Sequence, residues 1–157
     1  MKRAFVQMGM LALAGLVGAG CSMNWVNVKD SSELPGTVKV WLVHRDDDNF
    51  RFGVANQSQK PITILLDSIK LSSPRNSISR EPMHGGVAWG WTGAIVEGAV
   101  MGNSPVVPPG QTVSLDAHFD VDDAKIEKGD TVRLDFSNAV IQDGHPLAVT
   151  PLEFHIQ

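Results

Sequence analysis

The sequence predicts a mainly β protein, an antiparallel sandwich of about seven or eight strands. In most apolar segments, apolar and polar residues alternate with a period of two, which is typical of half-buried strands. These segments are short, and turns rich in Pro, Gly, Asn and Asp separate them. A length of 157 residues suits one domain. The alternative architecture that the pattern allows is a small β-barrel.

The first half of the chain contains an edge strand and three longer strands. Trp25, Val26 and Val28 indicate the edge strand, and the longer strands span 37–44, 50–55 and 62–71. In 37–44 both faces are apolar, because Val38, Val40 and Leu42 share one face while Trp41 and Val43 lie on the other. In 62–71 the apolar positions change parity, which predicts a bend or bulge near Asp67-Ser68.

Alternation resumes after the strong breaker Pro108-Pro109-Gly110. The strands predicted there span 111–119, 131–136 and 147–156. Residues 122–128 are consistent with one helical turn ended by Gly129. Asp143-Gly144 lies between two apolar stretches and predicts a hairpin with a type I′ turn.

The pattern of strands resembles that of immunoglobulin-like domains. The resemblance covers roughly 37–156 and rests on strand spacing alone. The chain has no Tyr and a single Cys, so it lacks the disulfide and the tyrosine corner of antibody-type domains.

The first twenty residues have the layout of a secretory signal peptide. Lys2 and Arg3 are followed by the apolar stretch 8–17, which is shorter than the roughly 20 residues that a membrane-spanning helix needs. The run Gly18-Ala19-Gly20-Cys21 resembles a bacterial lipobox, although Gly18 stands where that family usually has a large aliphatic residue.

This resemblance implies cleavage before Cys21 and a covalent lipid on its thiol, which is the only prosthetic group expected. It also implies a palmitate-type anchor at the periplasmic face of the outer membrane, because Ser22 rather than Asp follows the Cys. The expected organisation is therefore a signal peptide at 1–20, a lipidated Cys with a tether or edge strand at 21–36, and the sandwich at 37–157. Another cellular membrane is the alternative location.

Residues 85–102 are unusually rich in glycine and carry Trp89 and Trp91. Small residues recur every four positions, at Gly86, Gly90, Ala94, Gly98 and Gly102. On a helix these would form one stripe that admits close packing, and the segment resembles a glycine zipper of bacterial envelope proteins. A helical crossover, a Gly-rich loop or hairpin, and a helix that contacts membrane or a second copy all remain open.

Charge and motifs argue against several functions. With 13 basic and 17 acidic residues, the chain lacks the basic surface that nucleic acid requires. We find no catalytic motif, so no catalytic residue is assigned. The five histidines lack the spacing of a helical zinc pair, and the Asp-rich stretches 46–48 and 120–123 lack the pattern of a calcium-binding loop, so no metal ligand is assigned. The pairs His118 with Asp116 and His155 with Glu153 lie on outer strand faces.

These observations predict a non-enzymatic envelope lipoprotein whose sandwich binds or scaffolds another envelope component. The candidate contact surface combines Trp41 with the Gly/Trp segment. A periplasmic carrier of a small ligand or metal through His118 or His84 is the first alternative. Membrane contact or oligomerisation through the zipper-like segment is the second, and a hydrolase without a recognisable motif is the third.

Overall fold

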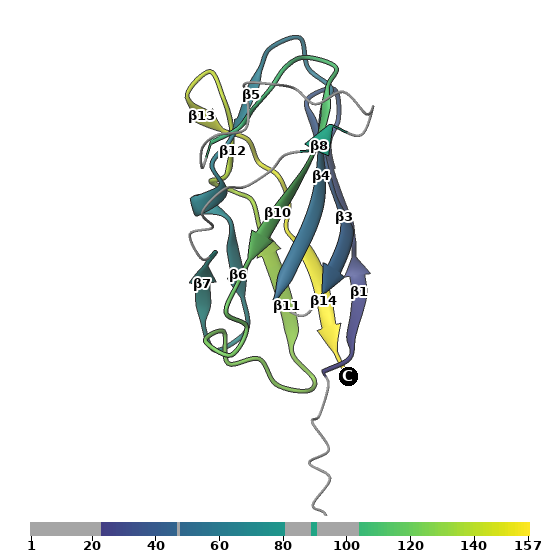
Figure 1. Cartoon of the computed structure of the whole chain (residues 1–157), viewed down its shortest axis with the longest axis vertical. Coiled ribbons are helices and arrows are strands. Elements are labelled where there is room, and N and C mark those ends of the chain that lie inside the picture. The colour runs from purple at the N-terminus through teal and green to yellow at the C-terminus, as the bar shows by residue number, and fades with distance from the viewer. Residues whose placement is uncertain (1–22, 47, 81–88, 91–103) are drawn as a thin grey trace, which may run out of the picture.

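Three antiparallel sheets form a β-sandwich in the computed structural model, which describes residues 23–46, 48–80, 89–90 and 104–157 (Figure 1). Sheet A has the order β1-β14-β11-β6-β7, sheet B the order β2-β3-β4-β10-β8, and sheet C the order β13-β12-β5-β9. The first eight strands are β1 (Trp25–Lys29), β2 (Ser31–Leu34), β3 (Val38–Asp46), β4 (Asn49–Asn56), β5 (Ile62–Ile64), β6 (Lys70–Ser72), β7 (Ser77–Ser79) and β8 (Trp89–Gly90). The others are β9 (Val106–Val107), β10 (Thr112–His118), β11 (Thr131–Asp135), β12 (Val140–Gln142), β13 (His145–Pro146) and β14 (Leu152–Ile156).

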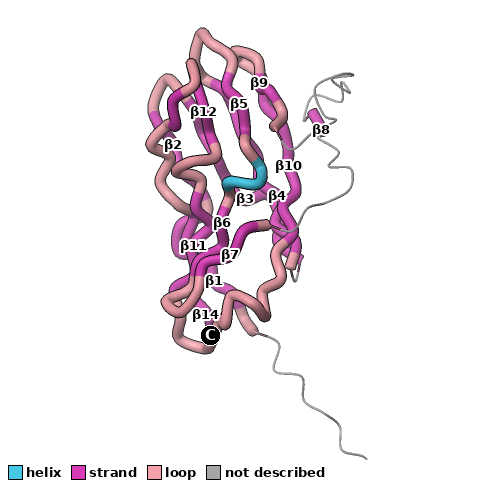
Figure 2. The backbone as a smooth tube through the Cα atoms, turned by 90° about the vertical axis from the view of Figure 1, so that its left-hand side faces the viewer, coloured by secondary structure: helices cyan, strands magenta, loops and turns pink. Residues whose placement is uncertain are grey.

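The predicted antiparallel sandwich is thus confirmed, and the sheets do not close into a barrel. The number of strands is larger than expected because the chain crosses between sheets in mid-segment. It leaves sheet A for sheet B at Asp30, between β1 and β2. The 3-10 helix η1 (Leu66–Ser68) divides the predicted strand 62–71 into β5 of sheet C and β6 of sheet A, which confirms the predicted bend (Figure 2).

An aromatic cluster joins the two faces of the sandwich. Phe50 of sheet B packs edge-to-face against Phe154 of sheet A, with ring centroids 5.8 Å apart. Trp25 contacts both rings at 5.8 Å, and Phe52 meets Phe136 at 5.2 Å. Full burial of such a side chain contributes about 1.5–3 kcal/mol, so these rings carry much of the attraction between the layers.

Two groups of loops lie at opposite ends of the molecule. The hairpin end comprises 35–37, 57–61, 108–111 and 142–146, and the termini end comprises 46, 48–49, 73–76, 119–130 and 157. At the hairpin end, the turn of β12 and β13 has positive φ at both Asp143 (51°) and Gly144 (79°), as the predicted type I′ turn requires. At the termini end, Asn24 and Gln157 exchange backbone hydrogen bonds of 2.8 and 3.3 Å. Both chain ends of the sandwich therefore leave from the same side (Figure 1).

Local expectations were wrong at two places in the second half. Residues 121–125 form successive turns rather than a helical turn, and Lys125 adopts a φ of 51° that interrupts any helix. The predicted strand 147–156 is strand only from Leu152, because Pro151 has no N–H to pair with a neighbour.

Candidate functional site

The outer face of sheet B carries the most distinctive side-chain arrangement of the described residues. Trp41 on β3 and Gly53 on β4 are cross-strand partners. A Cβ atom at Gly53 would lie 2.3 Å from Cε2 and Cζ2 of Trp41, so the indole rests directly on the glycine backbone. Gly53 is buried and Trp41 is half-buried. The sheet thus presents a flat aromatic surface where most strands present a polar side chain.

A hollow of about 420 Å³ lies beside this indole. Its lining comes from three strands and the sheet crossover, and consists of Asp30, Ser31, Lys39, Trp41, Leu42 and Ala55. The small side chains of Ser31 and Ala55 leave this space open beside the indole, which itself covers Gly53. The hollow is therefore a direct product of residue size along the register of β2, β3 and β4.

The charges around the hollow favour a cation. Nζ of Lys39 lies 3.8 Å from Oε2 of Glu33, so a neighbouring carboxylate balances the one ammonium of the lining. Asp30, which also lines the hollow, is exposed and adds a second negative charge. Together with the π face of an indole, this arrangement suits a positively charged group.

A cation–π contact of this kind already occurs elsewhere in the sandwich. The guanidinium of Arg45 lies 4.5 Å from the ring centroid of Trp25. The ring of Trp25 thus binds a cation of the protein itself, whereas Trp41 lines the hollow.

The carboxylates of the two His and carboxylate pairs, Asp116 and Glu153, each contact an arginine on a neighbouring strand. Both carboxylate oxygens of Asp116 accept hydrogen bonds from Arg51 across the strands, at 2.8 and 3.2 Å. This contact raises the pKa of Arg51 above its usual value. Oε1 of Glu153 likewise accepts from Nε of Arg133 at 2.9 Å. Arginine therefore engages both of these carboxylates.

Where they are described, the Asp-rich stretches lie at the end of β3, at Asp46, and in the turns that follow β3 and β10. Oδ1 of Asp120 accepts a hydrogen bond from the backbone N–H of Asp122 at 3.2 Å, as in an ordinary Asx turn. Asp47 lies outside the described residues. Within the parts of the chain that are described, no group of three or more His, Cys, Asp or Glu side chains is placed to hold a metal ion.

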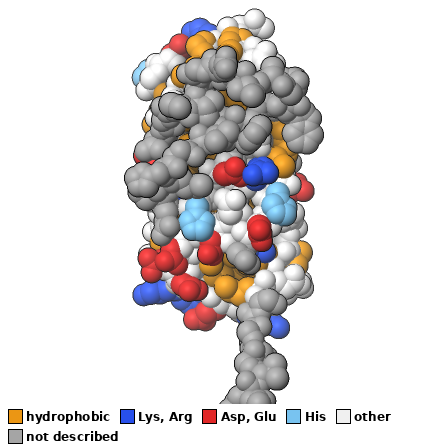
Figure 3. All heavy atoms as spheres, viewed as in Figure 1, with side chains coloured by type: hydrophobic (Ala, Val, Ile, Leu, Met, Phe, Trp, Pro, Cys, Tyr) orange, Lys and Arg blue, Asp and Glu red, His pale blue; other side chains and the backbone are white. Residues whose placement is uncertain are grey.

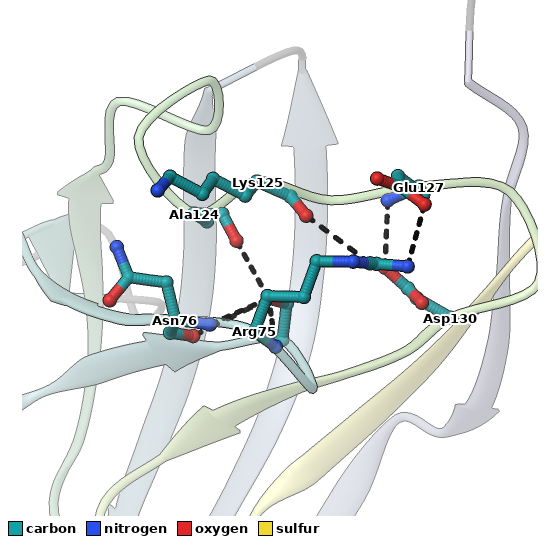
Figure 4. A network of polar contacts seen from close by, with 7 residues as sticks. Arg75, Asn76, Ala124, Lys125, Glu127 and Asp130 are labelled. Carbon is teal, nitrogen blue, oxygen red and sulfur yellow. Dashed lines mark hydrogen bonds and ion pairs between the residues drawn. The ribbon is translucent and has the colours of Figure 1, made fainter.

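A polar network braces the termini end (Figure 4). Arg75, in the turn between β6 and β7, donates to Asp130 at 2.5 Å and to Glu127 at 2.6 Å. The N–H of Glu127 donates to Asp130 at 2.7 Å. This backbone hydrogen bond, and then Arg75, lower the pKa of Asp130, against the opposing effect of burial. The network holds the loop between β10 and β11 against sheet A.

Only two residues of the Gly/Trp segment are described. Trp89 and Gly90 form β8, which pairs with Ser114 and Val113 of β10 at the edge of sheet B. A helix through these two residues is therefore wrong, and the alternative of a loop or hairpin is consistent with β8. The other candidates of this segment, Gly86, Trp91, Ala94, Gly98 and Gly102, lie outside the described residues, as do His84 and Cys21.

The structure thus places Trp41, Trp89 and Gly90 in one sheet. Strands β4 and β10 separate β3 from β8, which corresponds to about 14 Å at the usual strand spacing.

Sequence reasoning missed the role of Gly53. The signal was a glycine in the middle of an alternating strand, which often marks a close approach. Identifying the approaching group as Trp41 requires the register of the hairpin, and β3 shifts that register between Leu42 and His44.

In the described parts of the chain, no helix has the length and apolar character needed to cross a membrane. Comparisons of this chain with protein-family models, with curated proteins and with solved structures find no match.

Proposed function

We propose that this chain is a bacterial envelope lipoprotein, anchored by a lipid on Cys21, whose sandwich binds another envelope component without catalysing a reaction. The contact surface is the outer face of sheet B at Trp41. The observation that carries the binding role is the indole on Gly53 beside a hollow of about 420 Å³. The anchor rests on the signal-like segment 1–20 and the lipobox-like run that ends at Cys21.

The partner presents a basic group to this hollow. A cation placed within about 6 Å of an indole centroid is attracted by the ring quadrupole, by about 0.5–1 kcal/mol at exposed sites. The carboxylate of Asp30, which lines the hollow, supplies a counter-charge. An arginine or lysine side chain on the surface of another envelope protein meets both requirements.

A titration tests the binding role. Chemical shifts of the Trp41 indole and of the Lys39 and Ala55 amides are followed by NMR while Nα-acetyl-arginine amide is added. N-acetylglucosamine serves as a neutral probe. We expect shifts at these three residues that grow with the concentration of the arginine derivative, and none with the sugar. If only the sugar caused shifts, the ligand would be a glycan and the proposal of a cationic ligand would be wrong.

Two variants give the titration its controls. Trp41→Leu removes the π face while keeping an apolar side chain, and we expect it to abolish the shifts of the Lys39 and Ala55 amides. Val28→Ala alters an exposed apolar side chain of sheet A, away from the hollow, and should leave them unchanged. Equal binding by Trp41→Leu and the unaltered protein would show that this surface is not the site.

Cell fractionation tests the anchor. We expect the unaltered protein to incorporate labelled palmitate and to sediment with membranes, and Cys21→Ala to be released into the soluble fraction. A Cys21→Ala protein that remains entirely in the membrane would contradict the anchor.

A further inference from the structure

The tether between the proposed anchor and the sandwich is very short. Strand β1 begins at Trp25, and Asn24 is already held by its backbone hydrogen bonds to Gln157. Only three residue steps separate Asn24 from Cys21, and they span at most about 11 Å when fully extended. A lipid on Cys21 would therefore keep the start of β1 close to the bilayer surface.

The two ends of the sandwich lie at very different distances from this tether. Strand β3 runs from the hairpin end to the termini end, and its nine residues span about 30 Å. The described residues of the termini end are 46, 48–49, 73–76, 119–130 and 157, which lie in the lower part of Figure 1. The hairpin end comprises 35–37, 57–61, 108–111 and 142–146. A tether shorter than the body cannot allow the hairpin end to approach the lipid without laying the sandwich on its side.

The charge of the termini end opposes tight adsorption. The described residues of this end, 46, 48–49, 73–76 and 119–130, contain seven acidic and three basic residues. Figure 3 shows several acidic side chains gathered on the lower half of the visible face. Basic residues are attracted to the anionic surface of a membrane over about one Debye length, so an excess of acidic residues is repelled.

We infer that the sandwich stands upright on the bilayer, with its termini end facing the lipid surface and its hairpin end pointing away. This inference rests on the proposed lipid anchor at Cys21. The short tether limits the distance between the start of β1 and the bilayer. The acidic termini end is repelled by an anionic surface, so it does not insert into the lipid. The Trp41 hollow, five residues along β3 from Asp46, then opens sideways at about 17 Å above that end. A partner anchored in the same membrane can reach it at this height.

Energy transfer to the membrane tests the orientation. Lys128 at the termini end and Gln59 at the hairpin end are both exposed polar residues in turns, so Lys128→Cys and Gln59→Cys form a matched pair of labelling sites. The lipidated protein is purified from membranes, labelled with a donor dye, and placed in vesicles of phosphatidylcholine and phosphatidylglycerol that carry a headgroup acceptor. We expect several-fold stronger transfer from position 128 than from position 59.

The outcomes separate the orientation from the anchor. Flotation of the protein with the vesicles but equal transfer from both positions, or stronger transfer from position 59, would overturn the orientation alone. Failure to float with the vesicles would overturn the anchor and this inference with it. Insertion of ten Gly/Ser residues after Ser22 should reduce the difference between the two labels, because a flexible segment of this length adds about 16–19 Å of root-mean-square reach. An undiminished difference would show that the tether does not set the orientation.

Discussion

The indole of Trp41 occupies the space that a side chain at Gly53 would fill, since a Cβ atom at residue 53 would lie 2.3 Å from the ring. The two residues face each other across β3 and β4, so each depends on the other. A larger residue at 53 forces the indole outward, and a smaller residue at 41 exposes backbone of the sheet. This pair links the stability of sheet B to the shape of the candidate site.

Gly53→Ala should therefore displace the indole and destabilise the protein. Overpacking of this kind typically costs about 1–3 kcal/mol. Urea unfolding measures the free energy of unfolding, and NMR measures the shift of the Trp41 indole N–H. In a Trp41→Ala background the same change should cost much less, because the clash has been removed. Equal costs in both backgrounds would contradict the contact.

Asn56→Ala should be strongly destabilising because this amide connects three segments of the hairpin end. The buried Nδ2 donates to the carbonyls of Lys60 and Val107 at 2.7 and 2.9 Å, and Oδ1 accepts from the N–H and hydroxyl of Ser58. Loss of these bonds leaves buried polar groups unsatisfied, and we expect a loss of about 3 kcal/mol in urea unfolding. Asn138→Ala, at an exposed position, is the matched control and should change stability by less than about 0.5 kcal/mol. Similar values for the two variants would contradict the role of Asn56.

Asp130 should make stability dependent on acid. Its pKa in the folded protein is lowered from the ordinary value of 3.8, first by the N–H of Glu127 and also by Arg75. A carboxyl with a lowered pKa contributes its full stabilisation above its unfolded pKa and loses it as the pH falls through the lower, folded pKa. The stability contributed by Asp130 should therefore decline below about pH 4, and Asp130→Asn should flatten this part of the profile.

Thermal unfolding between pH 2 and 7 measures this effect. Asp122→Asn changes an exposed carboxylate of the same loop and should retain the acid dependence of the unaltered protein. If Asp122→Asn flattened the profile and Asp130→Asn did not, the acid dependence would not come from Asp130.

The ion pair between Arg51 and Asp116 should contribute little to stability. The exposed fractions of the two side chains are 45% and 20%, so water screens their attraction. A double-mutant cycle with Arg51→Ala and Asp116→Ala should give a coupling free energy below about 1 kcal/mol that decreases with added salt. A coupling free energy above about 2 kcal/mol would contradict this prediction, because it would mean that water does not screen the pair.

The local pattern of residues was sufficient to predict the class of fold. Alternation with a period of two identified β3, β4, β10 and β11, because one face of each strand must be buried while the other meets water. The bend after Leu66 and the type I′ turn at Asp143-Gly144 were also predictable, since a parity change and an Asp-Gly pair are local constraints on the backbone.

The sequence by itself therefore determined the main strands, such as β3, β4, β10 and β11, and which face of each of them is buried. Only the tertiary structure decided which strands are neighbours, where the chain passes from one sheet to another, and in what register β3 meets β4. Those choices depend on long-range contacts between sheets, such as Phe50 with Phe154, which no local pattern contains. For that reason the sequence was enough to select Trp41 as a candidate contact residue. It could not predict the packing of Trp41 on Gly53, the hollow beside the indole or the ion pair between Arg75 and Asp130.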